Sequence, residues 1–200
     1  MRAIFLSASV PVIGRGDFYK TADVMLIQAA VRAFVIVALG RKLIVWGGHP
    51  AVTPMIWATA KDLGVSYSDW VHLFQSKFFN EFFPDENKLF KNVTYIDAVD
   101  NDRGSSLTKM RVEMLKSYQF DAAVFVGGME GIFEELALFQ KFHPNATLIP
   151  VGSTGGAALE LAQKLRGSVS SSHQAIDYIG LFHAELKIAP DEPRGAATGA

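Results

Sequence analysis

A glycine-rich turn with two adjacent carboxylates follows a short apolar run and carries the clearest chemical signal in the chain. Gly127, Gly128 and Gly131 would let the backbone approach a phosphate closely. A carboxylate would repel a phosphate at the same place. Glu134 and Glu135 therefore fit better beside a sugar, where they could accept hydroxyl hydrogen bonds or stabilise a cationic sugar-like transition state. Acids also favour helix N-termini for dipole reasons, but two acids with three glycines favour a functional site.

Similar turns follow three other apolar runs, and each combines small residues with hydroxyl, amide or charged groups. Glycines before a helix free backbone N–H groups to face an anion, and an arginine can meet a phosphate. Each turn also has a structural explanation, as a tight turn, a polar loop or a helix N-cap. The residues are Ser7, Ser9 and Arg15, then Gly47 and Gly48, and finally Ser153, Thr154 and Gly155.

Arg111 lies on a predicted helix whose start should face the same edge as these turns. The alternative for Arg111 is a solvated charge on the helix surface. The sequence leaves open whether Arg15, Arg103 or Arg111 would make the main phosphate contact. His49, in the second turn, is expected to be a structural or rim histidine and not a catalyst.

These residues must be positioned by a sheet, because short apolar runs alternate with longer helical segments along the chain. Strands are predicted at 3–6, Leu43–Trp46, Val93–Ile96, 122–126 and Thr147–Val151, with a further short strand at 71–74. Helices are predicted at 21–39, 51–63, 105–118, 130–142, 156–166 and 174–187. This alternation predicts an α/β fold with a Rossmann-like, doubly wound parallel sheet and helices on both faces. Ligands bind such sheets beyond the carboxyl ends of the strands.

The segment 75–92 interrupts this alternation with a polar, aromatic-rich stretch. It is predicted to be a long irregular connection that contains a short helix. Long loops inside compact domains are often functional, and the alternative is a surface loop whose FFNEFF phenylalanines pack on the core. Residues 1–189 are predicted to form a single domain, and 190–200 a disordered tail.

Composition excludes several classes of function. The chain has 200 residues, 50% of them hydrophobic, and a net charge of −1, so it lacks the basic character of a nucleic-acid binder. It has no cysteine, and its five histidines are scattered, so no metal site and no cofactor are predicted. The apolar segment 24–39 is shorter than the roughly 20 residues that cross a bilayer and contains Gln28 and Arg32. A buried helix and no membrane partner are therefore predicted. Without a signal-peptide pattern, a cytoplasmic location is expected.

The turns GGHP and VGGMEGIFEE, with an arginine-bearing helix between them, resemble the SLOG superfamily. That group includes the Lonely-Guy phosphoribohydrolases, also called lysine decarboxylase-like proteins, and nucleotide-sensing domains. The resemblance implies a Rossmann-like, commonly dimeric protein. In the enzymes, which cleave the N-glycosidic bond of a nucleoside monophosphate, the signature is PGGxGTxxE. The resemblance would make Arg111 the phosphate or sugar partner and Glu134 or Glu135 the carboxylate near the ribose.

Four departures from that signature favour the sensor-like branch of the superfamily. Val126 replaces the proline, and Ile132 replaces the threonine. Met129 and Glu130 stand where the signature has one residue, so the register does not distinguish Glu134 from Glu135. Val112 follows Arg111, where the enzymes usually carry lysine.

The sequence therefore predicts a domain that binds a phosphate-bearing nucleotide or nucleotide-derived ligand, as a sensor and as a homodimer. An N-glycosidase is the alternative, and an interaction protein with a decayed site is a third. The predicted catalytic residues are Arg111, Glu134 and Glu135. The predicted ligand-binding residues are Ser7, Ser9, Arg15, Gly47, Gly48, Gly127, Gly128, Met129, Glu130, Gly131, Ser153, Thr154 and Gly155.

Overall fold

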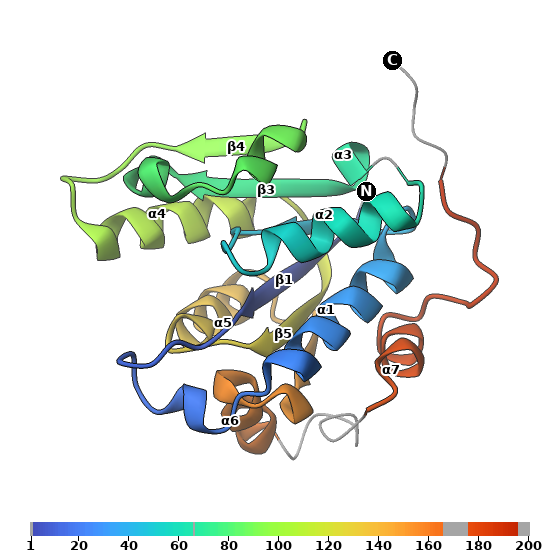
Figure 1. The fold of residues 1–200 in the computed structure, drawn as a ribbon. Helices are drawn as coiled ribbons and strands as arrows, with labels where there is room; N and C mark the ends of the chain where they lie inside the picture. The colour runs from blue at the N-terminus through green and yellow to red at the C-terminus, as the bar shows by residue number, and fades with distance from the viewer. Residues whose placement is uncertain (1, 66, 166–175, 196–200) are drawn as a thin grey trace.

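The structure is a computed structural model that describes residues 2–65, 67–165 and 176–195. The described residues form a six-stranded sheet in which every strand pair is parallel, in the order β4-β3-β2-β1-β5-β6 (Figure 1). The strands are β1 Ala3–Ser9, β2 Leu43–Trp46, β3 Val71–Ser76, β4 Val93–Ile96, β5 Phe120–Gly127 and β6 Thr147–Val151. The predicted Rossmann-like α/β fold is confirmed, including the short strand at 71–74.

Helices cover both faces of this sheet, as the continuous apolar strands predicted. The helices are α1 Val24–Ala38, α2 Thr53–Asp62, α3 Tyr67–Trp70, α4 Arg103–Lys116, α5 Gly131–Phe142, α6 Gly156–Lys164 and α7 Tyr178–Glu185. Residues of β1 alternate between the two cores. Ile4 and Leu6 pack with α1, α2 and α7, whereas Ala3 and Phe5 pack with α4, α5 and α6.

The apolar helix α1 is a buried core helix, as predicted. Ile27, Val31 and Phe34 have no exposed surface and pack between the sheet and α7. Phe34 meets Phe182 of α7 edge to face, with 5.5 Å between the ring centroids. Among the described residues, no helix combines the length and the apolarity needed to cross a membrane.

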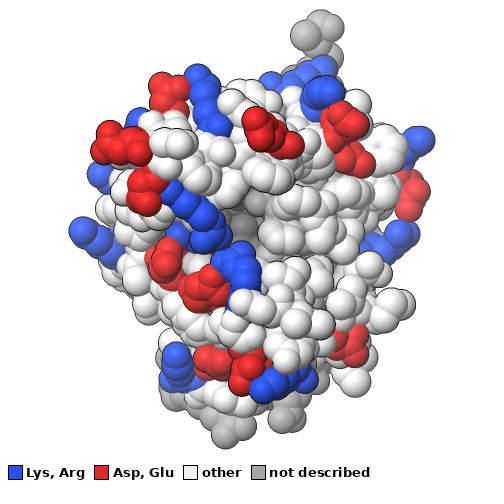
Figure 2. Space-filling view, turned by 60° about the vertical axis from the view of Figure 1, so that its left-hand side comes forward, with Lys and Arg blue, Asp and Glu red and all other residues white. Residues whose placement is uncertain are grey.

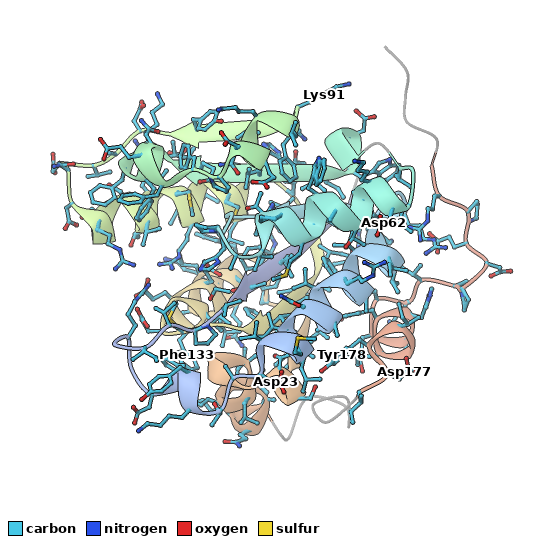
Figure 3. All side chains as sticks on the ribbon, viewed as in Figure 1. Asp23, Asp62, Lys91, Phe133, Asp177 and Tyr178 are labelled. Atoms are coloured by element: carbon cyan, nitrogen blue, oxygen red, sulfur yellow. The ribbon has the colours of Figure 1, made fainter. Side chains whose placement is uncertain are left out.

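Aspartate N-caps fix where three helices begin. The carboxylate of Asp23 accepts hydrogen bonds from two N–H groups of α1, at 2.8 and 3.1 Å, and Asp102 accepts one from Ser105 at 2.8 Å. Asp177 caps α7 in the same way (Asp23 and Asp177 in Figure 3). The cap at Asp102 starts α4 at Arg103, two residues before the predicted start. The cap at Asp177 starts α7 at Tyr178, later than the predicted 174, and residues 166–175 lie outside the described part.

Two glycines join the ends of three structural elements at the carboxyl edge of the sheet. Gly128 donates its N–H to the Ser9 carbonyl at 2.8 Å, and its own carbonyl accepts from the Ala157 N–H at 3.0 Å. Gly127 donates to the buried Thr154 hydroxyl at 2.9 Å. The φ angle is 59° at Gly127 and 79° at Gly128, and residues with side chains rarely adopt such positive values. The junction thus ties β1, β5 and the start of α6 together.

The segment between β3 and β4 contains two short 3-10 helices, η2 Lys77–Phe82 and η3 Asp85–Leu89. The buried hydroxyl of Ser76 accepts a hydrogen bond from the Phe78 N–H and caps η2. The prediction of an irregular connection with a short helix therefore agrees with the structure. η3 lies against α2, so this segment folds back over the sheet edge.

Part of the segment predicted to be a disordered tail, residues 190–195, lies against the body of the domain. The Arg194 guanidinium donates to the Leu39 and Ile36 carbonyls, and the Gly195 N–H donates to the Gly40 carbonyl at 2.6 Å. Residues 196–200 lie outside the described part, so the prediction of a disordered tail stays untested there.

Gly155 is expected to be sensitive to substitution. It combines a φ of 72° with a ψ of −159°, a conformation restricted almost entirely to glycine, and a Cβ there would lie 1.9 Å from the Thr21 carbonyl oxygen. Gly155→Ala should therefore lower the free energy of unfolding by about 3 kcal/mol, measured by urea denaturation.

Gly64→Ala is the matched control, because Gly64 also has a positive φ, of 64°, but a Cβ there would meet nothing within 4 Å. Its expected cost is the backbone penalty alone, about 1 kcal/mol. Equal losses in the two variants would contradict the steric explanation for Gly155.

Candidate functional site

A pocket of about 270 Å³ opens at the carboxyl edge of the sheet. It is lined from the ends of β1, β2 and β3, from one side of α4 between Arg103 and Arg111, from the start of α5, and from η2. The sheet order changes direction between β1 and β5, which is where open α/β sheets bind ligands. Figure 2 turns this edge toward the viewer and shows a hollow bordered by charged side chains on one side and by uncharged ones on the other.

A buried arginine and a carboxylate form the floor of the pocket. The side chain of Arg111 on α4 is only 8% exposed, and its Nε lies 3.2 Å from Oε1 of Glu135 on α5. The second carboxylate oxygen of Glu135 accepts a hydrogen bond from the Ser7 hydroxyl at 2.5 Å. Arg111 also pairs with Glu134. The Glu135 carboxylate is thus held in one orientation from two sides, at the end of β1.

The structure separates the two carboxylates that the sequence could not distinguish. Glu135 lines the pocket and its side chain is 17% exposed. Glu134 lies outside the pocket lining with a side chain that is 60% exposed. Successive residues of a helix point about 100° apart, so only one of two adjacent glutamates can face the pocket.

Gly131 gives Arg111 the space for this arrangement. It occupies the first position of α5, and a Cβ added there would lie 2.8 Å from an Arg111 terminal nitrogen. A side chain at this position would displace the guanidinium from its two carboxylate partners. The glycine that the sequence assigned to a phosphate turn therefore accommodates a buried charge.

Charged groups also gather at the rim of the pocket. Arg15, in the loop after β1, forms an ion pair with Glu130, and the two side chains are 40% and 50% exposed. Partial burial opposes ionisation of Glu130. The hydrogen bond from Arg15 and the positive charges of Arg15 and Arg103 outweigh that effect and lower the pKa of Glu130. Arg15 and Arg103 therefore place two positive charges around one carboxylate at the pocket mouth.

The ends of β2 and β3 contribute uncharged polar groups. The Ala51 N–H donates to Nδ1 of His49 at 3.2 Å, and burial, followed by the charge of Arg15, lowers the pKa of His49. The imidazole is thus neutral near pH 7, with its proton on Nε2. Gln75 donates its amide N–H to the Gly47 carbonyl at 3.3 Å. Gly48 allows that contact, since a Cβ there would lie 1.7 Å from Gln75 Nε2.

An aromatic wall completes the pocket. It consists of Phe79, Phe82 and Phe83 with Pro84, from η2 and the residues that follow it. Phe82 is 71% exposed although it is a large apolar side chain. Phe83 packs on Tyr95 of β4, with 5.8 Å between ring centroids. These rings border the pocket instead of filling the core.

The structure brings many of the predicted site residues to one pocket and leaves others outside its lining. The lining includes Ser7, Ser9, Arg15, Gly47, Gly48, Met129, Gly131, Arg111 and Glu135. Outside it lie Gly127, Gly128, Glu130, Glu134, Ser153, Thr154 and Gly155. Several of the latter make contacts within the fold. The Thr154 hydroxyl bonds to Val151 and Gly127, and the Ser153 hydroxyl to Tyr178.

The sequence did not identify most of the uncharged side chains that line the pocket. Gln75 and Ser76 end β3, which extends two residues beyond the predicted strand end at residue 74, so the sequence pattern does not place them at a strand end. Phe79, Phe82 and Phe83 belong to the aromatic-rich segment, whose functional and structural explanations the sequence left open. The signal that could have found them is the position of FFNEFF directly after a strand.

Comparison with known proteins places the chain in a family. The model of the SLOG cluster3 family matches residues 17–186, which include Arg111 and Glu135 but not Ser7 or Arg15. No curated protein matches the chain. Membership in a SLOG family supports a nucleotide-related binding or processing role. The match covers far more than half of the sequence, and the fold agrees with it, so this chain belongs to the SLOG cluster3 family.

Proposed function

We propose that the pocket binds a phosphate-bearing nucleotide or nucleotide-derived small molecule and that the protein acts as a sensor of it. The observation that carries this proposal is a single pocket at the switch edge of the sheet that joins a buried Arg111–Glu135 pair to two rim arginines. Its volume of about 270 Å³ lies just below the roughly 300–1,000 Å³ range of small-molecule sites. The proposal includes that the protein forms a homodimer and is located in the cytoplasm.

The rim arginines are the best phosphate partners in this pocket. Arg111 is already engaged by two carboxylates, so a phosphate there would meet the negative charge of Glu134 and Glu135. The Arg15–Glu130 pair is partly exposed, and exposed ion pairs contribute about 0–1 kcal/mol. A phosphate can therefore take the place of the Glu130 carboxylate at small cost and contact Arg15 and Arg103 together.

The floor carboxylate suits the hydroxyls of a sugar. Ser7 and Arg111 hold the two oxygens of Glu135 in the floor of the pocket. Each carboxylate oxygen has two lone pairs, so the group can accept further hydrogen bonds while it keeps these partners. Ser9, at the end of the same strand, adds a second hydroxyl to the pocket lining.

An N-glycosidase is the second candidate, because one carboxylate, Glu135, lines the pocket beside a buried arginine. In such a reaction the bond between the anomeric carbon and the base nitrogen breaks, and water supplies the new oxygen. The departing base nitrogen takes up a proton. The negative charge of Glu135 would stabilise the cationic sugar in the transition state.

Phosphate recognition is tested by the Arg15→Ala variant. The unmodified protein is expected to gain thermal stability with adenosine, guanosine, cytidine or uridine monophosphate or with ADP-ribose, by about 2.7 kcal/mol at 100 times the dissociation constant. Arg15→Ala should reduce the melting shift for these phosphate-bearing probes, because it removes a charged hydrogen-bond donor.

Arg32→Ala is the matched control, since Arg32 pairs with Asp62 between α1 and α2 and does not line the pocket. Its ligand-induced shift should equal that of the unmodified protein. Absence of a shift with every probe in the unmodified protein would contradict the binding proposal itself.

The glycosidase candidate is tested by comparing Glu135→Gln with Glu134→Gln. If the protein releases free base from a nucleoside monophosphate, chromatography should find that Glu135→Gln lowers kcat by at least about 100-fold. Glu134→Gln should lower it much less, because that side chain is mostly exposed outside the pocket.

A larger loss in Glu134→Gln than in Glu135→Gln would reverse the assignment of the two carboxylates. A melting shift without base release in the unmodified protein would exclude turnover of that probe and leave the sensor proposal in place.

A further inference from the structure

The pocket is polar at one end, near β1, and aromatic at the other, beyond β2 and β3. Ser7 on β1 and Glu135 on α5, which follows β5, supply the charged and hydroxyl groups. The other end lies beyond β2 and β3 and supplies His49, Gln75 and the phenylalanines. β1 and β3 are two strand spacings apart, which is about 10 Å. A ligand that spans the pocket must therefore have a polar end and a flat apolar end.

The aromatic wall is built by the local structure of η2. η2 is kinked at Phe79, whose φ of −105° and ψ of 19° are not helical. Phe79, at this kink, and Phe82, at the end of η2, both line the pocket. The cap at Ser76 fixes where this helix begins. Phe78, the neighbour of Phe79, does not line the pocket, although the two rings pack edge to face with 5.0 Å between centroids. Three of the four phenylalanines of the FFNEFF segment, Phe79, Phe82 and Phe83, thus line the pocket.

Exposed phenylalanine rings next to a polar pocket have a specific use. Phe82 leaves 71% of its surface exposed, and removal of that apolar surface from water is favourable. A flat ring placed on this wall would remove that apolar surface from water. Stacking on aromatic side chains is a common way to hold a nucleobase, because every base has a π-face.

Two uncharged polar side chains beside the wall can read the edge of such a ring. The neutral His49 imidazole can donate through Nε2–H because Nδ1 already accepts from Ala51. Gln75 uses its amide N–H toward Gly47, which leaves its carbonyl oxygen as an acceptor. One donor and one acceptor next to an apolar wall match the in-plane groups of a nucleobase.

We infer that Phe79, Phe82 and Phe83, with His49 and Gln75, form a subsite for the planar base of the ligand. The Ser7–Glu135 end then takes the sugar. This inference rests on the proposed nucleotide-binding function and adds the direction in which the ligand lies across the sheet edge.

The test is calorimetric titration of the protein with adenosine, guanosine, cytidine and uridine monophosphates and with ribose 5-phosphate, which lacks a base. The variants are Phe79→Ala, Phe82→Ala and the control Phe78→Ala. Phe82 is mostly exposed, so its substitution is expected to leave the fold intact even if Phe79→Ala does not. Melting temperatures without ligand check this for each variant.

The inference predicts that the best monophosphate binds at least about tenfold more tightly than ribose 5-phosphate. Phe82→Ala and Phe79→Ala should each weaken that nucleotide by about fivefold or more and leave ribose 5-phosphate unchanged, whereas Phe78→Ala should change neither. Equal affinities for ribose 5-phosphate and all nucleotides, unaffected by the wall variants, would overturn the base subsite while the proposed function stands. Absence of binding by all five probes, including ribose 5-phosphate, would overturn the proposed function.

A separate variant tests whether His49 recognises the polar edge of the base. His49→Phe keeps an aromatic ring but removes the Nε2–H donor. It should reduce the differences in affinity among the four monophosphates by severalfold. Unchanged differences would remove His49 from the subsite and leave the stacking role of the phenylalanines intact.

Discussion

The junction at Gly127 and Gly128 is the constraint on which the functional edge of this domain depends. Gly128 bonds through its N–H to the end of β1 and through its carbonyl to the start of α6. A Cβ at Gly128 would lie 2.1 Å from the Ile132 side chain, so α5 can approach only a bare backbone. The same bonds that join the strands thus set where Ser7 and Glu135 meet. A glycine turn that resembles a phosphate-binding motif can in this way act as a packing device.

Burial of Arg111 is the second determinant of the site, and it explains the local excess of acidic residues. A buried guanidinium is costly unless it is paired and hydrogen-bonded. Glu134 and Glu135 supply two carboxylates from adjacent helix positions, one exposed and one in the pocket. Because the arginine has these partners inside the protein, its charge orients Glu135. The positive charges closer to solvent are those of Arg15 and Arg103 at the rim.

The segment between β3 and β4 gives the pocket its asymmetry. The other strand ends contribute small, hydroxyl or charged groups, whereas the chain after β3 forms 3-10 helices and contributes aromatic rings. Such rings would be unfavourable on an ordinary surface but are useful at a binding site, where a ligand covers them. Three of the four differences between this chain and the glycosidases lie around the turn after β5, and the fourth, Val112, follows Arg111 on α4. The aromatic and the charged sides of the pocket therefore come from separate segments of the chain.

The sequence by itself determined the strand–helix alternation, the parallel sheet and the edge at which the site lies, because apolar periodicity and turn residues are local properties. It also placed Arg111 and the glutamate pair on neighbouring helices. Only the tertiary structure decided that Glu135 faces the pocket and Glu134 does not, since a one-residue difference in the turn left their register open. Likewise, only packing decided that Thr154 holds Gly127 while Phe82 borders the pocket, because a hydroxyl or a ring near a strand end is compatible with either role until its neighbours in space are known.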